Sequence, residues 1–218
     1  YDTHPISEQQ VLDKLVHDGF DLSSLNQGIL QDYDQDHFGG LPATDTLACL
    51  ANIGESTHVL DVCCGLGGPA RYLADHYGSR VTCIDLNQNR LDGAIRLTEM
   101  VGLEEKVSFR CANALSNGLP SAEFDSLIAQ EAFCHIPNKP ELLTECVRVL
   151  KPGGLIAFTD VLEGTSMTTP VRDRLRQEMA FTELNTLDNY RVLLEANSCE
   201  VKEAKDLSEE WTQIVVKR

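Results

Sequence analysis

The chain has 218 residues and a mass of 24.1 kDa, which corresponds to one domain with an elaboration. Its 18 Lys and Arg stand against 34 Asp and Glu, and the net charge of −16 disfavours a nucleic-acid partner because it repels phosphate backbones. The longest apolar runs, such as residues 155–158, are far too short to cross a bilayer, so no membrane partner is expected.

The first 54 residues are expected to form a helical cover rather than a separate domain. The segment SEQQ at 7–10 has the pattern of a capping box ahead of an apolar periodicity, which predicts a helix beginning near Ser7. A second helix is predicted over residues 42–53, because a proline stands in its first turn and Gly54 follows its end.

Residues 55–160 alternate short apolar runs with helical patterns, which is typical of a doubly wound, mostly parallel α/β sheet. The runs are nearly continuous in Val, Leu, Ile, Phe and Cys, as expected for strands buried on both faces. The predicted strands are 58–62, 80–85, 106–111, 124–130 and 154–160, and the helices between them are 69–77, 87–101 and 140–150.

The remaining residues, 161–218, are expected to form a lid and the C-terminal edge of one domain that spans 1–218. A helix is predicted over 187–197. Residues 200–205 and 211–217 then read as a short antiparallel strand pair at the sheet edge. The alternative is a helix that begins at Ser208 in a chain that stops early, so the sequence leaves both the tail and its completeness open.

The strongest local signal is a strand that runs into a glycine-rich turn, HVLDVCCGLGGPAR at 58–71. Gly65 and Gly67 permit a tight turn and the close approach of a ligand at the carboxyl end of the strand. Gly65-x-Gly67-x-x-Ala70 satisfies the relaxed dinucleotide fingerprint, and S-adenosylmethionine (SAM) is the competing cofactor. Asp61 favours SAM, because a carboxylate in an apolar strand needs a partner, and SAM offers an α-ammonium where a dinucleotide offers phosphates.

Further cofactor contacts are expected after the second and third strands. Asp85 ends the second strand, where a carboxylate can accept both ribose hydroxyls of an adenosine. Asn113 stands just past the third strand and is placed to hydrogen-bond an adenine edge, with an ordinary turn asparagine as the alternative. Leu86 and Ala114, their neighbours in sequence, complete this predicted set.

With these segments, the chain resembles class I SAM-dependent methyltransferases over nearly its whole length. The segments that carry the resemblance are VLDVCCGLG at 59–67, CID at 83–85, NA at 113–114, FDSL at 124–127 and RVLKPGG at 148–154. Those that resemble the small-molecule branch are GGPARYLA at 67–74, YDQxHxGG at 33–40 and QExxxHIP at 130–137. That branch includes sarcosine/dimethylglycine N-methyltransferases and, more distantly, phosphoethanolamine N-methyltransferases and ubiquinone-pathway C-methyltransferases.

Two positions depart from the family pattern. Cys63 stands where the family usually has the first glycine of its motif, which is tolerable if the residue has a negative φ. Asn113 stands where an Asp is common. The chain is also short for this branch, whose members often carry a longer lid after the fifth strand.

The resemblance implies methyl transfer from SAM to a small-molecule acceptor, with S-adenosylhomocysteine (SAH) as product. We expect the acceptor to be an amine of the glycine, sarcosine or dimethylglycine type. O- or C-methylation of a small metabolite is the alternative enzyme activity, and a SAM-binding protein without catalysis is an alternative of another class.

The acceptor is expected near the ends of the fourth and fifth strands. The predicted substrate-binding residues there are Gln130, Glu131, His135 and Asp160, and Gln130 is also expected to contact the cofactor. Glu131 and His135 are the catalytic candidates, because a hydroxyl or an acidic carbon needs a proton acceptor, whereas an amine that binds neutral does not.

A lid over the cofactor is expected from the segment that ends at residue 40. Tyr33 and His37 are expected to close over the methionine end of SAM, with the Tyr33 ring either near the sulfonium or in core packing. The pair Gly39-Gly40 would serve as the joint of this lid.

The eight cysteines form no CxxC pair, so no metal site is expected. Reduced thiols and an N-terminus without the pattern of a signal peptide indicate a cytoplasmic setting. A homodimer is compatible with the sequence, which leaves the oligomeric state open.

Overall fold

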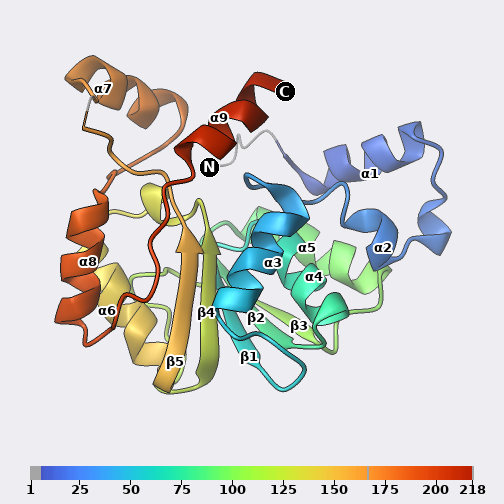
Figure 1. Ribbon diagram of the computed structural model, residues 1–218. Helices are drawn as coiled ribbons and strands as arrows, with labels where there is room; N and C mark the ends of the chain where they lie inside the picture. Colours follow the sequence, from blue (N-terminus) through green and yellow to red (C-terminus); the bar gives the residue numbers. More distant parts are fainter. Residues whose placement is uncertain (1–5, 166, 218) are drawn as a thin grey trace.

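The computed structural model describes residues 6–165 and 167–217, and its centre is a sheet of five parallel strands in the order β3-β2-β1-β4-β5 (Figure 1). The doubly wound fold predicted from the sequence is therefore confirmed. The strands are β1 His58–Val62, β2 Arg80–Asp85, β3 Val107–Cys111, β4 Phe124–Gln130 and β5 Leu150–Thr159. The order reverses between β1 and β4, which creates the crevice at which such sheets bind ligands.

Both faces of the sheet are covered, because successive residues of each strand point to opposite sides. On one face, Val59 and Val81 pack in a cluster with residues of α3 Gly40–Leu50, α4 Gly68–His76 and α5 Gln88–Met100. On the other face, the sheet packs against two helices, α6 Lys139–Val149 and α8 Leu187–Ala196, in a cluster that contains Leu60, Leu127 and Phe133. All five residues of β1 are buried, as predicted for a central strand.

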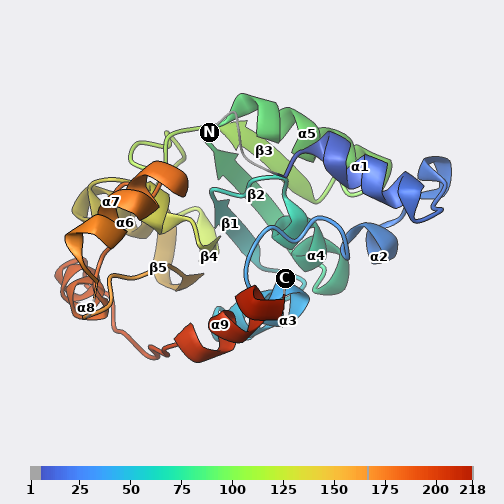
Figure 2. The same ribbon diagram turned by 90° about the horizontal axis from the view of Figure 1, so that it is seen from above.

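The N-terminal segment contributes α1 Glu8–His17, the 3-10 helix η1 Leu22–Ser24 and the short α2 Gln27–Leu30. The predicted capping box is present, since Ser7 and Gln10 exchange side-chain to backbone hydrogen bonds at the start of α1. Val11 and Leu15 of α1 pack with Leu97 of α5, so these helices extend the layer beside the sheet (Figure 2).

The predicted strand pair over residues 200–205 and 211–217 is wrong. Residues 200–207 have no regular structure, and residues 208–217 form α9 Ser208–Lys217, the alternative that the sequence left open. Asp206 accepts a hydrogen bond from the Ser208 N–H at 2.9 Å, and acidic residues occupy the first turn, both of which favour a helix N-terminus. In Figure 1, α9 lies above the ends of β4 and β5.

The sequence analysis also missed α7 Thr169–Glu178, although Pro170 stands in its first turn and Val171 and Leu175 have helical spacing. None of its residues is buried. The strand β5 begins four residues before the predicted boundary and includes the KPGG segment. Among the described residues, no helix is long and apolar enough to span a membrane.

Candidate functional site

The glycine-rich turn connects β1 with α4 at the centre of the crevice. Gly65 has a φ of +55° and Gly67 a φ of +75°, in the left-handed region that glycine adopts without strain. Cys63 has a φ of +61°, so the condition under which this cysteine would be tolerable is not met. A non-glycine residue in this region costs on the order of 1–2 kcal/mol, and the turn therefore contains a strained residue.

Asp61 is the only residue of β1 whose side chain ends in a carboxylate, and it is 4% exposed. Its Oδ2 has no hydrogen-bond partner among the described residues. Burial, reinforced by the nearby charge of Asp85, raises the pKa of Asp61 to about 7. A buried carboxylate without a partner is costly, and a bound cation would compensate it.

The end of β2 provides the next part of the site. Asp85 accepts a hydrogen bond from the Gly65 N–H at 3.0 Å and another from the Asn87 N–H at 2.9 Å, which fixes its carboxylate beside the glycine turn. Leu86 follows and is 69% exposed, an apolar side chain that a planar adenine could cover.

At the end of β3, Asn113 is exposed and Ala114 is buried. The Asn113 Oδ1 accepts a hydrogen bond from the Leu115 N–H at 3.0 Å, which is the turn geometry of the alternative interpretation. That hydrogen bond uses only the Oδ1, so the turn is compatible with a contact between the Asn113 amide nitrogen and adenine.

These residues fit SAM on the chemistry of their side chains. The unpaired Asp61 matches an α-ammonium, the oriented Asp85 matches a ribose diol, and the exposed Leu86 matches an adenine face. Asp61 does not fit a dinucleotide, because a buried carboxylate beside the glycine turn would repel its phosphates. Asp85 fits the ribose of either cofactor.

Residues 34–38, which we call the strap, lie across the glycine turn. A Cβ built on Gly68 would lie 2.3 Å from the Asp34 carbonyl oxygen, so the strap backbone rests directly on the first turn of α4. The strap residue Phe38 stacks on Trp211 of α9, with ring centroids 4.9 Å apart. The strap is thus held between the turn and the C-terminal helix.

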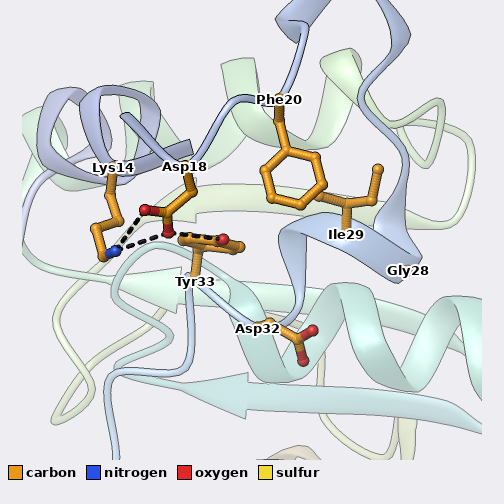
Figure 3. Close-up of a pocket in the computed structure, with 7 residues that line it drawn as sticks. All are labelled: Lys14, Asp18, Phe20, Gly28, Ile29, Asp32 and Tyr33. Carbon is orange, nitrogen blue, oxygen red and sulfur yellow. Dashed lines mark hydrogen bonds and ion pairs between the residues drawn. The ribbon is translucent and has the colours of Figure 1, made fainter. Parts of the chain in front are cut away.

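Tyr33, the residue before the strap, faces a pocket of about 530 Å³ within the N-terminal helices (Figure 3). Its hydroxyl donates to Asp18 at 2.9 Å, and its ring meets Phe20 edge to face at 6.0 Å. This places the hydroxyl on the N-terminal helices, and a contact of the ring with the sulfonium stays a prediction.

His37 is buried and connects the strap to the end of β4. Its Nδ1 lies 3.0 Å from the Gln130 Nε2, and the Thr44 hydroxyl donates to the Gln130 Oε1 at 3.3 Å. The structure therefore brings His37 and Gln130 together, as expected for residues of one site.

Glu131 follows β4 with a φ of +46°, another non-glycine residue in the left-handed region. Its Oε2 accepts from the Phe38 N–H at 2.7 Å, and its Oε1 accepts from the Thr159 hydroxyl at 2.6 Å. Burial raises the pKa of this carboxyl. Glu131 thus joins the strap to the ends of β4 and β5.

The other two acceptor-side candidates are also engaged by the protein. Asp160 accepts from the Cys134 N–H at 2.8 Å and from the Tyr190 hydroxyl at 2.7 Å, and burial raises its pKa. His135 lies in the 3-10 helix η2 Phe133–His135, with its Nδ1 3.2 Å from the Ala180 carbonyl oxygen and its ring 5.1 Å from that of Phe181. The catalytic roles of Glu131 and His135 stay predictions.

Sequence reasoning missed three residues at this site: Arg71, Arg90 and Trp211. Arg71 bonds to Asp34 at 2.8 Å, and Arg90 bonds to Asp36 at 2.9 Å. The sequence shows two acidic residues in the strap and two arginines in separate helices, but their spacing does not indicate that they form ion pairs. In the described part of the chain, no group of three or more His, Cys, Asp or Glu is arranged to hold a metal ion.

Comparison with known proteins identifies relatives of one enzyme class. The model of a family described as "Methyltransferase domain" matches residues 60–158. The chain is 32% identical to methyltransferase GfsG of Streptomyces halstedii over 81% of this chain and 70% of that protein. It is 31% identical to a glycine/sarcosine/dimethylglycine N-methyltransferase of Actinopolyspora halophila over 75% of this chain, but only 29% of that protein.

Among solved structures, phosphoethanolamine N-methyltransferase 2 of Haemonchus contortus in complex with S-adenosyl-L-methionine has a TM-score of 0.78. The match covers 99% of this chain and 47% of that one, and at 18% identity it shows the fold alone. The relatives include N-, C- and O-methyltransferases, so they do not identify the acceptor atom.

Proposed function

Since the chain belongs to the SAM-dependent methyltransferases, we propose that it transfers the methyl group of SAM to the nitrogen of a small amine of the glycine type. In this proposal Asp61 binds the α-ammonium of the cofactor, Asp85 accepts from the ribose hydroxyls, and Leu86 covers the adenine. When bound, SAM supplies an electrophilic methyl group on a sulfonium.

The observation that carries the choice of an amine is the charge at the ends of β4 and β5. Glu131 and Asp160 are largely buried there, and they accept hydrogen bonds from uncharged groups: the N–H groups of Phe38 and Cys134 and the hydroxyls of Thr159 and Tyr190. Neither carboxylate is neutralised by these donors. The charge of Lys139 acts against the rise in the pKa of Asp160, but its ammonium donates to the Ile136 and Glu183 carbonyls and not to the carboxylate. An ionised carboxylate in such a place attracts an ammonium group and favours its binding.

An amine also fits the few demands of this chemistry. Alignment of the nucleophile with the methyl group supplies on the order of 7–11 kcal/mol through lost translational and rotational freedom, so the protein acts mainly by positioning. The amine attacks as the neutral base, and Glu131 and Asp160 would hold its protonated form until a proton leaves to solvent. No imidazole is required for this step, and His135 would then orient the loop after β4.

The strap contributes by covering the cofactor. Phe38 is held by Glu131 through its backbone, while His37 is held by Gln130, so strap and acceptor side are connected in the same hydrogen-bond network. Deleting residues 1–40 should abolish methyl transfer and weaken SAM binding. Because the deletion also removes Asp34, the buried partner of Arg71, the loss supports a covering role only if circular dichroism shows that the truncated protein is folded. Normal turnover of the truncated protein would show that the strap only packs against the domain.

The experiment that tests the function is transfer of radiolabelled methyl from SAM to a panel of amines, phenols and enols. Label in a glycine-type amine, with none in the other two classes, is the expected result. Label only in phenols or enols would move the activity to O- or C-methylation. SAH binding in calorimetry without transfer to any acceptor would indicate a SAM-binding protein without catalysis.

A further inference from the structure

Two arginines connect the strap to the elements that flank the glycine turn. Arg71 of α4 binds the Asp34 Oδ2 through its Nη2 at 2.8 Å. Arg90 of α5 binds the Asp36 Oδ2 through its Nη2 at 2.9 Å. Two carboxylates of the strap, only two positions apart, are therefore each paired with an arginine from a different helix.

Each guanidinium also lies against a glycine of the turn. A Cβ built on Gly65 would lie 2.6 Å from the Arg90 Nη2, closer than real Cβ contacts come, and one on Gly67 would lie 3.1 Å from the Arg71 Nη1. At Gly65 the absence of a side chain therefore makes room for Arg90, whereas at Gly67 it makes room first for the Phe109 ring, 2.9 Å from such a Cβ, and then for Arg71. Each arginine bridges one strap carboxylate and one glycine of the cofactor turn.

The two bridges differ in burial. The side chains of Arg71 and Asp34 are both 0% exposed, and Arg71 also donates to the Thr98 hydroxyl at 3.0 Å. The side chains of Arg90 and Asp36 are 12% and 25% exposed. Opening the first pair would leave charges buried without a partner, whereas the second pair lies where water can replace the lost contact.

We propose that Arg90 is a positioning residue of the cofactor site, which holds the strap on the glycine turn through Asp36. The Asp34–Arg71 pair stays closed as a fixed anchor, and the Asp36–Arg90 pair opens when the cofactor enters or leaves. This inference rests on the proposed placement of SAM beside the glycine turn, and it explains why Arg90 contacts both Gly65 and the strap.

The chain contains a built-in reporter of the strap. Trp211 is the only tryptophan in the sequence, and its ring stacks on that of Phe38 in the strap. Movement of the strap away from the turn changes the surroundings of this indole, and tryptophan emission therefore follows opening and closing.

The experiment measures SAH binding by calorimetry and SAH release by stopped-flow tryptophan emission, in the full chain. The variants are Arg90→Met, which keeps the apolar stem, and Arg90→Lys, which keeps the charge. The matched control is Arg96→Met, because Arg96 lies on the same helix and pairs with Glu8 of the N-terminal cover, but is 56% exposed.

We expect Arg90→Met to raise both the SAH dissociation constant and the release rate about tenfold, the effect of losing one partly buried charged hydrogen bond. Arg90→Lys should recover part of this loss, Arg96→Met should stay within about twofold of the wild type, and the thermal midpoints should stay close together. Wild-type affinity and release in Arg90→Met would overturn the proposal, and so would an equal loss in Arg96→Met.

A fall in affinity that only parallels a fall in the thermal midpoint would also overturn it, because Arg90 would then act through stability. Failure of the wild-type protein to bind SAH in calorimetry is a different result, since it would remove the cofactor site itself.

Discussion

The two halves of the crevice present their carboxylates in different ways. At β1, Asp61 is buried with an oxygen that no described residue hydrogen-bonds, whereas at β4 and β5 both oxygens of Glu131 and of Asp160 accept hydrogen bonds from the protein. The cofactor half is therefore incomplete without a ligand, while the acceptor half is closed by the strap and α8. A buried carboxylate oxygen without a hydrogen-bond partner, as in Asp61, indicates directly where a ligand binds. Carboxylates that the protein already hydrogen-bonds, as in Glu131 and Asp160, indicate instead which protein segments must move before a ligand can bind.

The largest expected effect is on stability, and it comes from breaking the Asp34–Arg71 pair that anchors the strap. Removing the buried charge in Arg71→Met leaves Asp34 buried and unpaired, and should lower the free energy of unfolding by about 3–5 kcal/mol. Denaturant unfolding checks the value. Loss of less than about 1 kcal/mol would mean that the strap is not anchored on α4 in solution.

The cofactor half is tested by Asp85→Ala, which removes a hydrogen-bonded charged acceptor. We expect SAH binding to weaken by about 2–3 kcal/mol in calorimetry, in a protein that stays folded by circular dichroism. Unchanged affinity in the folded variant would exclude the placement of the ribose beside β2.

The acceptor half is tested by Glu131→Gln, which keeps the shape and removes the charge. If the carboxylate attracts an ammonium group, kcat/KM for the amine should fall about tenfold, or 1.4 kcal/mol, with the KM for SAM unchanged. The thermal midpoint should stay close to that of the wild type, because two effects oppose each other. Gln removes a charge that burial disfavours, as the raised pKa of Glu131 shows, but its NH2 group cannot accept the second of the two hydrogen bonds that the carboxylate accepts. A lower thermal midpoint with wild-type kcat/KM would show that Glu131 only stabilises the position of the strap.

The smallest effect is expected at the strained turn. Cys63→Gly should stabilise the protein by about 1 kcal/mol, because glycine adopts the φ of +61° without strain. Ala122→Gly is the matched control, since Ala122 is exposed and has a φ of +56°. Destabilisation by Cys63→Gly alone would show that packing of the thiol outweighs the strain.

The sheet could be predicted from the sequence because strands that are buried on both faces consist almost entirely of apolar residues, as in β1 and β4. Asp61 could be singled out for the same reason, as a carboxylate that interrupts such a run. The partners of Glu131, Asp34 and Asp36 could not, because they depend on how the strap folds back across the sheet. The helix α7 was missed for another reason: Val171 and Leu175 have helical spacing, but two apolar residues among ten give only a weak periodicity.

Asp61 as the partner of the cofactor's ammonium is the central claim, and the pH dependence of SAH affinity tests it most directly. With a pKa of about 7 in the ligand-free protein, Asp61 is protonated at lower pH and must ionise to pair with the ammonium. Because the folded-state pKa lies above the ordinary 3.8, the ligand-free protein should lose stability as pH rises from about 4 to about 7.

Calorimetric SAH affinity should rise about tenfold per pH unit up to about 7 and then level off. It should be flat with pH in Asp61→Asn. Affinity for 5′-methylthioadenosine, which lacks the amino-acid part, should be flat in both proteins. An SAH affinity that does not depend on pH in the wild type, or that Asp61→Asn leaves unchanged, would contradict the claim.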